Sequence, residues 1–111
     1  MSEYYAHRHL TDFGRVGDAA PEVSRKFFDF YAEAFKDGAL SEREKALIAL
    51  AVAHTVQCPY CIEAYTNESL AKGADLPQMT EAVFVATAIR GGATLVHGMQ
   101  MLDVAKAKGM G

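Results

Sequence analysis

The sequence predicts an all-α fold, a bundle of about five to six helices, for a chain of 111 residues. Three observations lead to this prediction. Apolar side chains recur at steps of three and four residues along most of the chain, which is the period of an α-helix. No segment alternates apolar and polar residues over a useful length, as a half-buried strand would. Residues that begin and end helices stand at the boundaries of the periodic segments.

The composition limits the classes of function. Half of the residues are hydrophobic and 23% are charged, which is ordinary for a soluble domain, and the length suits a single domain over residues 1–111. A net charge of −3 and the lack of any Lys/Arg run predict no nucleic-acid partner. The N-terminus lacks a signal-peptide layout, and the longest apolar run, residues 46–53, falls well below the roughly 20 residues needed to span a bilayer. We therefore predict no membrane partner and a cytoplasmic location, where structural disulfides are uncommon.

Residues 1–20 are expected to be irregular, with one short turn around residues 9–13. Pro21 then begins the first long helix at a position where its missing N–H has no cost, and Gly38 ends it. Aromatic residues at helical spacing form one face of this helix, which we expect to be core or subunit contact: Phe27, Phe28, Phe30, Tyr31 and Phe35.

A second long helix is predicted over residues 42–57. Ser41 and Glu44 have the spacing of a capping box immediately before an apolar run. From residue 46 to residue 53 the helix is apolar on every side, which is typical of a helix surrounded by protein.

The remaining helices are predicted over residues 59–72, 77–90 and 93–108. Pro59 begins the first of them and Gly73 closes it. Asp75 caps the next helix, and Gly91 and Gly92 are expected to interrupt it. The short connections between all these helices indicate one bundle.

Cys58 and Cys61 form a C-x-x-C motif with proline directly after the first cysteine. If Cys58 lies at the N-terminal edge of the helix that Pro59 begins, the unpaired N–H groups and the positive helix end favour a thiolate. Cys61 then lies one turn further on nearly the same face, so the two sulfurs can close a disulfide. In a reducing compartment this motif indicates redox chemistry or a metal site; buried apolar packing is the third alternative.

Three further residues are candidates for the same site. His54 precedes Cys58 by four residues and can accept its proton or pair with its thiolate. Tyr65 follows Cys61 by four residues, and its hydroxyl can donate a hydrogen bond near the pair. Glu44 lies about 15 Å from His54 along the helix axis, so it requires a bend or a neighbouring subunit to reach the cysteines. Alternatively, His54 is a hydrogen-bonded core residue, or it joins the two cysteines as a third metal ligand.

Other polar side chains allow a structural and a functional interpretation. Arg90 either stabilises the end of its helix through the helix dipole or pairs with a carboxylate such as Glu44 across a helix interface. His7 and His9 lie in the irregular N-terminal segment and are expected to be solvated.

The run REKALIALAVAHTVQCPYCIEAYT resembles the core of the carboxymuconolactone decarboxylase and alkyl hydroperoxidase D (AhpD-like) superfamily, with a fit over about residues 40–98. A closer resemblance, to the arsenosugar biosynthesis-associated peroxidase-like subgroup, covers nearly the whole chain. It is carried by FGRVGDAAPE, GALSEREKALIALAVAH, QCPYCIEAYT, KGADLPQMTEAV and AIRGGATLVHGMQM.

The resemblance implies an all-α AhpD-like fold around a helical hairpin, assembled as trimers or hexamers. It also implies that Cys61 attacks a peroxide oxygen and Cys58 resolves the product, whereas the helix-dipole argument favours Cys58 as the more acidic thiol, so both assignments stay open. The hydroperoxidase pattern has a glutamate and a histidine in its proton relay where this chain has Ala46 and Tyr65. Glu44 and His54 are the nearby substitutes.

The predicted function is therefore a thiol-dependent, peroxidase-like oxidoreductase in which Cys58 and Cys61 cycle between dithiol and disulfide. Its partners would be a small oxidised substrate and a dithiol electron donor, with no cofactor and no metal; only the subgroup resemblance implies a link to arsenic. The alternative is a non-catalytic oligomeric protein whose cysteine pair binds a metal or arsenite. Lactone decarboxylation fits poorly, because the decarboxylase branch typically lacks the cysteine pair.

Overall fold

The computed structural model describes residues 5–110, and every regular element in that range is helical. The elements are α1 (His7–Thr11), the 3-10 helix η1 (Phe13–Gly17), α2 (Pro21–Phe35), α3 (Glu42–Thr55), α4 (Pro59–Ala71) and α5 (Leu76–Ala107). The predicted all-α class is confirmed. The N-terminal segment is more regular than expected, because α1 and η1 occupy most of it.

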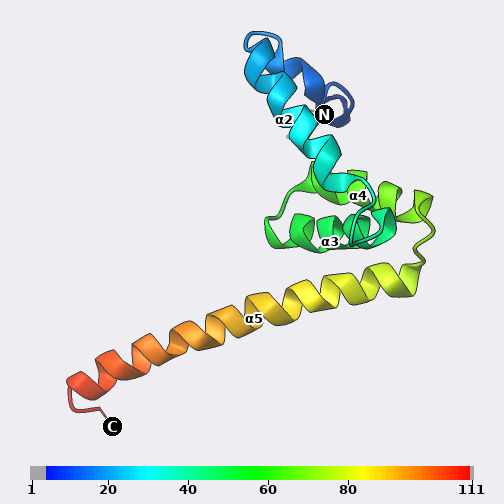
Figure 1. Cartoon of the computed structure of the whole chain (residues 1–111). Helices are drawn as coiled ribbons and strands as arrows, with labels where there is room; N and C mark the ends of the chain where they lie inside the picture. The colour runs from blue at the N-terminus through cyan, green and yellow to red at the C-terminus, as the bar shows by residue number, and fades with distance from the viewer. Residues whose placement is uncertain (1–4, 111) are drawn as a thin grey trace.

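Helices α3 and α4 lie side by side at the centre, with α2 against one side and α5 crossing the other (Figure 1). Their buried apolar core is small: Ala46, Leu50, Ala53, Ala74, Met79 and Ala86. Leu50 and Met79 are its two large side chains, and Leu47 and Tyr65 pack against the cluster that they form with Ala74. A core made mostly of alanine buries little hydrocarbon, so one chain gains limited stability from it.

Both predicted N-caps are present. The Glu44 N–H donates to Ser41 Oγ at 3.1 Å, and the Ser41 N–H donates to Glu44 Oε1 at 2.8 Å, which completes the capping box of α3. Asp75 and Gln78 form the same reciprocal pair at the start of α5, with both bonds at 2.9 Å. Local sequence alone therefore places these two helix starts.

Three helices end in the same way, with one residue in the left-handed backbone region just after the last turn. These residues are Gln57 after α3 (φ 58°), Gly73 after α4 (φ 89°) and Gly109 after α5 (φ 81°). In each case backbone N–H groups return to carbonyls of the last turn in the pattern of a Schellman motif. Glycine adopts this conformation freely, whereas Gln57 is a non-glycine residue held there, directly before the cysteine pair.

The predicted break at Gly91 and Gly92 is wrong, because α5 runs unbroken from Leu76 to Ala107. Glycine lowers helix propensity by about 1 kcal/mol relative to alanine, but it keeps the N–H group that the helix needs. Helix-forming residues on both sides of the pair continue the hydrogen-bond ladder through it. The helices predicted over residues 77–90 and 93–108 are thus one.

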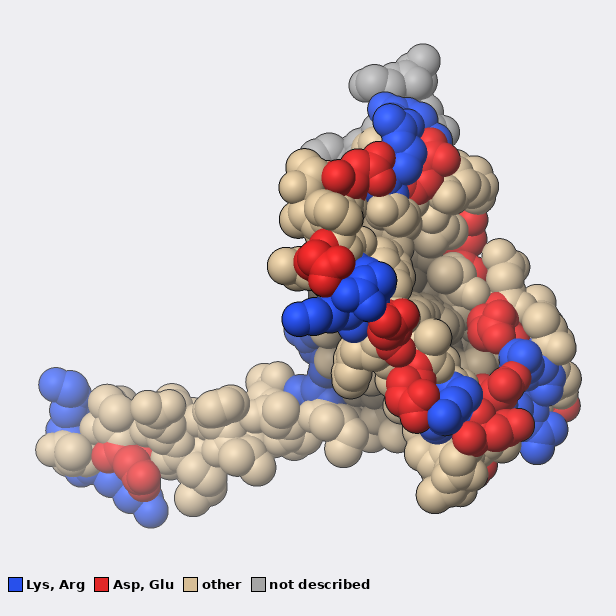
Figure 2. Space-filling view, turned by 45° about the horizontal axis from the view of Figure 1, so that its top comes forward, with Lys and Arg blue, Asp and Glu red and all other residues tan. Residues whose placement is uncertain are grey.

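The distal half of α5, about residues 91–107, extends away from the other helices as an arm (Figure 1). From Thr87 to Met110 every residue is exposed except Gly98 and Ala105, which are half-buried. The radius of gyration is 19.1 Å, against about 13 Å for a compact domain of this length. The face shown in Figure 2 is uncharged over most of the arm, with charged residues near its base and its end.

Among the described residues, α5 is the single helix long and apolar enough to cross a membrane, with a mean hydropathy of 1.2 over its most apolar window. The membrane prediction from the sequence used the longest uninterrupted apolar run, which lies in α3. That criterion therefore did not detect α5. Core helices of soluble proteins meet the same criterion, and this one is uncovered in the single chain.

Candidate functional site

The two cysteines lie at the start of α4, as the sequence predicts. Cys58 is the N-cap of α4, Pro59 is its first residue, and the Cys61 N–H donates to Cys58 Sγ at 3.2 Å. The structure joins Cys58 and Cys61 in a disulfide, with their Cα atoms 5.2 Å apart. After reduction, the same N–H and the positive end of α4 would stabilise a Cys58 thiolate.

The turn that carries Cys58 is held by the end of α3. The Cys58 N–H donates to the Ala53 carbonyl at 3.0 Å, and the Gln57 N–H donates to the His54 carbonyl at 3.2 Å. These two bonds fix the turn between α3 and α4, in which the Gln57 backbone is in the left-handed region.

Arg90 supports the same turn from α5. Its guanidinium donates to the Thr55 carbonyl, in the last turn of α3. A cation is favourable at that end of a helix, where the carbonyl groups are unpaired. The predicted alternative that Arg90 pairs with Glu44 is not found, since the partner of Arg90 is a backbone carbonyl. The guanidinium does stabilise the C-terminal end of a helix, but that helix is the neighbouring α3.

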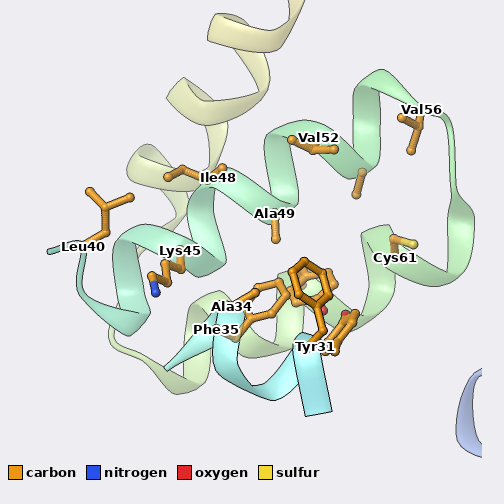
Figure 3. A pocket seen from close by; sticks show the side chains of 13 residues that line it. Tyr31, Ala34, Phe35, Leu40, Lys45, Ile48, Ala49, Val52, Val56 and Cys61 are labelled. Atoms are coloured by element: carbon orange, nitrogen blue, oxygen red, sulfur yellow. The ribbon is translucent and has the colours of Figure 1, made fainter. Parts of the chain in front are cut away.

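An open pocket of about 680 Å³ lies beside Cys61, between α2, α3 and α4. Its half-buried or buried floor comes from these three helices, and its exposed rim comes from α2, α3 and two residues that flank α3, Leu40 and Val56. The floor contains Tyr31, Phe35, Ala49, Ala53, Cys61 and Tyr65; the rim contains Phe30, Ala34, Leu40, Ile48, Val52 and Val56. Figure 3 shows Cys61 on α4 across from Val52 on α3 and from Val56 just after the end of α3. A sulfur of the pair is thus placed on an accessible apolar cavity.

Aromatic side chains form much of the pocket floor. Tyr65 stacks in parallel on Phe35, with ring centroids 5.2 Å apart, and Phe35 stacks in turn on Tyr31. Burial raises the pKa of Tyr31 above its usual value, so this phenol stays neutral at physiological pH. Three residues of the aromatic face of α2, Phe30, Tyr31 and Phe35, line this pocket; its expected role as core or subunit contact stays a prediction.

Lys45 is the one charged residue among those that line the pocket, and its Nζ donates to the Lys36 carbonyl at 2.6 Å. Sequence reasoning did not identify it as a site residue. Its position follows from the phase of α3, which turns Lys45 toward the same side as Ile48, Ala49 and Val52.

His54 lies at a different cavity from Cys61. Its Nδ1 is 2.8 Å from the Leu50 carbonyl, an arrangement in which Nδ1–H donates. The side chain lines a small cavity with residues of α3 and α5: Thr55, Val83, Ala86, Thr87 and Arg90. The expected hydrogen-bonded helix histidine is therefore observed, and the role of His54 in a proton relay stays a prediction.

Glu44 is an exposed capping residue. The Ser41 backbone N–H, followed by its hydroxyl, lowers the pKa of the Glu44 carboxyl below its usual value. The pocket beside Cys61 is lined by the next residue, Lys45, and not by Glu44. The Glu44 carboxylate accepts a hydrogen bond in the capping box of α3, and its predicted catalytic role stays a prediction that can be tested directly.

We expect Glu44→Gln to keep the full reactivity of the cysteine thiols and the full rate of the predicted peroxide reduction, because glutamine retains the acceptor of the capping box. Since folding lowers this pKa, ionised Glu44 contributes stability above its unfolded-state pKa that is lost as the pH falls through its folded-state pKa. The unfolding midpoints of the wild type and the variant should therefore converge between about pH 5 and pH 3. Loss of turnover at neutral pH in a fully folded variant would instead assign Glu44 to the relay.

The two positions that hold the relay glutamate and histidine in the hydroperoxidase pattern differ in environment. Tyr65 stands at the position of the relay histidine and lines the same pocket as Cys61. Ala46 replaces the relay glutamate and is 0% exposed, inside the core rather than on the pocket. One of the two relay positions is thus available to a substrate in this chain, and it carries a phenol.

The N-terminal segment packs onto the cysteine turn. His9 Nδ1 lies 3.1 Å from the hydroxyl of Tyr60, and the Tyr5 and Tyr60 rings meet edge to face at 5.5 Å. His7 pairs with Glu63 at 2.9 Å. Both histidines are exposed, as predicted, but they have protein partners that sequence periodicity could not reveal, because the contacts join distant segments.

Residues 5–110 contain no group of three or more His, Cys, Asp or Glu side chains arranged to hold a metal ion. The alternative in which His54 completes a metal site with the two cysteines therefore lacks support from geometry: His54 and Cys61 line different cavities.

The chain is similar to several known proteins. It is 40% identical over 91 residues to uncharacterised protein 4 of the cox locus of Paracoccus denitrificans, covering 82% of each chain. It is 29% identical over 90 residues to an uncharacterised protein of Cupriavidus necator, covering 81% of this chain and 80% of the relative. A crystal structure of a protein from Methanobacterium thermoautotrophicum superposes with a TM-score of 0.75 at 32% identity, covering 78% of this chain and 98% of that one.

A family model described as the carboxymuconolactone decarboxylase family matches residues 21–104, from the start of α2 to the last turn of α5. This match spans the cysteine pair, the pocket and most of the arm. The protein therefore belongs to the carboxymuconolactone decarboxylase family.

Proposed function

We propose that this protein is a thiol-dependent peroxidase that reduces apolar organic hydroperoxides with the Cys58–Cys61 pair. The observation that carries the proposal is the position of Cys61: it belongs to a pair close enough to form a disulfide, and it lines an open apolar pocket. A peroxidatic thiol needs both features, access for the oxidant and a second thiol to resolve the oxidised product.

The two sulfurs have different surroundings, which suggests different roles. The Cys61 thiolate attacks the terminal oxygen of the hydroperoxide; an S–O bond forms, the O–O bond breaks, and the alkoxide takes a proton to leave as an alcohol. Cys58, whose thiolate the helix start favours, then attacks the sulfenic sulfur of Cys61. The S–S bond forms, and hydroxide leaves and is protonated to water.

An external dithiol completes the cycle. It supplies two electrons and two protons, returns Cys58 and Cys61 to thiols and becomes a disulfide itself. Such donors are maintained in reducing compartments, which is consistent with the proposed cytoplasmic location.

The pocket favours the apolar part of a substrate. Its floor combines the aromatic rings of Tyr31, Phe35 and Tyr65, and Lys45 is the single cation on its lining. The Tyr65 hydroxyl is the candidate donor to the leaving alkoxide, since Tyr65 lies one helical turn from Cys61 and lines the same cavity. An organic hydroperoxide with a hydrocarbon body should therefore react faster than hydrogen peroxide.

Stoichiometry tests this proposal on the wild-type chain. Reduced protein, freed of reductant, is mixed with one equivalent of cumene hydroperoxide, and free thiols and the product alcohol are counted. We expect two thiols to be lost for each alcohol formed, and dithiothreitol to restore both thiols.

Thiols that stay free in the presence of hydroperoxide would refute the peroxidase proposal. Paired thiolates also bind trivalent arsenic, a soft acceptor. Stoichiometric arsenite binding without peroxide reduction would favour the binding-protein alternative and the arsenic link that the subgroup resemblance implies.

A further inference from the structure

The pocket beside Cys61 has a cation at one end and a sulfur at the other. Figure 3 shows Lys45 near the start of α3 and Cys61 on α4. Cys61 lies across from Val52 and Val56, near the end of α3. Along the axis of α3, Lys45 is about 10 Å from Val52 and about 16 Å from Val56. The ammonium group and the thiol therefore act on opposite ends of any molecule that fills the pocket.

Hydrocarbon lines the pocket between these two ends, with contributions from Ile48, Ala49 and the ring of Phe35. The cavity volume of about 680 Å³ lies within the range of about 300–1,000 Å³ that is typical of sites for small organic molecules. Such sites combine a mostly apolar lining with a few polar groups that fix the orientation of the ligand. Among the described residues of this lining, Lys45 is the charged residue that can do so.

The Lys45 ammonium has no carboxylate partner among residues 5–110. None of the ion pairs in that range includes it, and the acceptor of its hydrogen bond is the Lys36 carbonyl. The neighbouring carboxylates have other partners, since Glu42 pairs with a lysine of α4 and Glu44 belongs to the capping box of α3. An ammonium group has three N–H donors, so two remain for an anion. A half-buried cation beside hydrocarbon is suited to bind the anionic head of an otherwise apolar ligand.

We propose that the substrate is a fatty-acid hydroperoxide whose carboxylate binds Lys45 while its peroxide group reaches Cys61. This inference rests on the proposed function and names its substrate class. The methylene chain between the two groups lies on the apolar lining, the bond changes at sulfur are those given above, and the product is the corresponding hydroxy acid. The separation of the two ends requires a peroxide group that is many carbon atoms away from the carboxylate, as in an oxidised unsaturated fatty acid.

Lys45 also has a purely structural interpretation, in which its bond to the Lys36 carbonyl only joins the end of α2 to α3. Under that interpretation, substitution of Lys45 changes stability but creates or removes no preference between a charged and an uncharged substrate. A comparison of an acid with its methyl ester separates the two interpretations, because the ester has the same hydrocarbon body and lacks the charge.

The kinetic test therefore compares linoleic acid hydroperoxide with its methyl ester near neutral pH, both below the concentration at which they form micelles. In the wild type, kcat/KM for the acid should exceed that for the ester about tenfold, the effect of one charge-assisted hydrogen bond. In Lys45→Met this ratio should fall to about one, since no cation remains on the lining, whereas Lys45→Arg keeps the charge and should retain a preference for the acid.

Arg43→Met is the matched control, because it removes an exposed cation from the same helix at a position that does not line the pocket. This variant should keep the wild-type ratio. Equal rates for acid and ester in the wild type, or a Lys45→Met variant that still prefers the acid, would overturn the proposal.

Binding of a ligand without a peroxide separates this inference from the peroxidase proposal. Calorimetric titration of the wild-type disulfide form should give a dissociation constant about tenfold lower for decanoate than for decanol, which has the same chain length and no charge. Preferential binding of decanoate without reduction of any hydroperoxide would refute the peroxidase proposal and support Lys45 as a carboxylate site. Reduction of cumene hydroperoxide, with no preference for the acid in binding or turnover, would support the peroxidase proposal and refute the carboxylate site.

Discussion

Replacing Cys61 by serine is expected to abolish peroxide reduction, with a loss of at least about 10³-fold, as for removal of a nucleophile. Replacing Cys58 by serine should allow one turnover and no more, because the attacking sulfur remains and the resolving sulfur is gone. Both substitutions suit the fold. Serine is a preferred N-cap residue at position 58, and it is close in size to the half-buried Cys61.

A sulfenic-acid trap such as dimedone separates the two variants. After one equivalent of hydroperoxide, Cys58→Ser should carry the label on Cys61, and Cys61→Ser should carry none. The reverse pattern would assign the attack to Cys58, as the helix-dipole argument alone suggests. Label on both variants, or full turnover in either one, would contradict a division of roles between the two sulfurs.

Ala46→Glu, which places a glutamate where the hydroperoxidase pattern has one, is expected to destabilise the protein by at least about 3 kcal/mol. Ala46 is fully buried in the small core, so the longer side chain overpacks it and its carboxyl is desolvated. Burial raises the folded-state pKa of such a carboxyl above its unfolded value of about 4.3. The variant should therefore lose stability as the pH rises from about 4.5 toward neutrality.

Urea unfolding at several pH values measures this effect, and Ala46→Leu is the control. Leucine adds volume without charge, so its cost of about 1–3 kcal/mol should not vary with pH. A glutamate variant that is as stable as the wild type at pH 7 would show that position 46 has access to water or a cation, and the position could then serve a relay as it does in the hydroperoxidase pattern.

Much of the local structure could be predicted because the signals act within one helical turn. Ser41 with Glu44 predicts the start of α3, and Pro59 predicts the start of α4 with Cys58 just before it. Gly73 predicts the end of α4, since its left-handed backbone needs no neighbour. At Gly91 and Gly92 the prediction failed, because the intrinsic cost of glycine is smaller than the gain from continuing a long helix.

The candidate site was predictable in part for the same reason. Cys61 and Tyr65 are one turn apart on one helix, so their shared location follows from helical geometry. The surroundings of His54 and Arg90 were less predictable. Arg90 donates to a carbonyl group of α3, and both side chains line a cavity between α3 and α5, so their contacts depend on how these two helices cross. Lys45 and the rings of α2 could not be predicted as site residues, because the pocket that they line depends on how three helices pack together.

The sequence by itself determined the helical class, the helix caps and a dithiol at the N-terminus of a helix, because each depends on backbone groups within a few residues. Tertiary structure alone decided which sulfur lines an apolar cavity, which side chains surround it and that a long apolar arm is left uncovered. The physical reason is that the direction of a side chain follows from helix phase, whereas the surface it meets depends on distant packing.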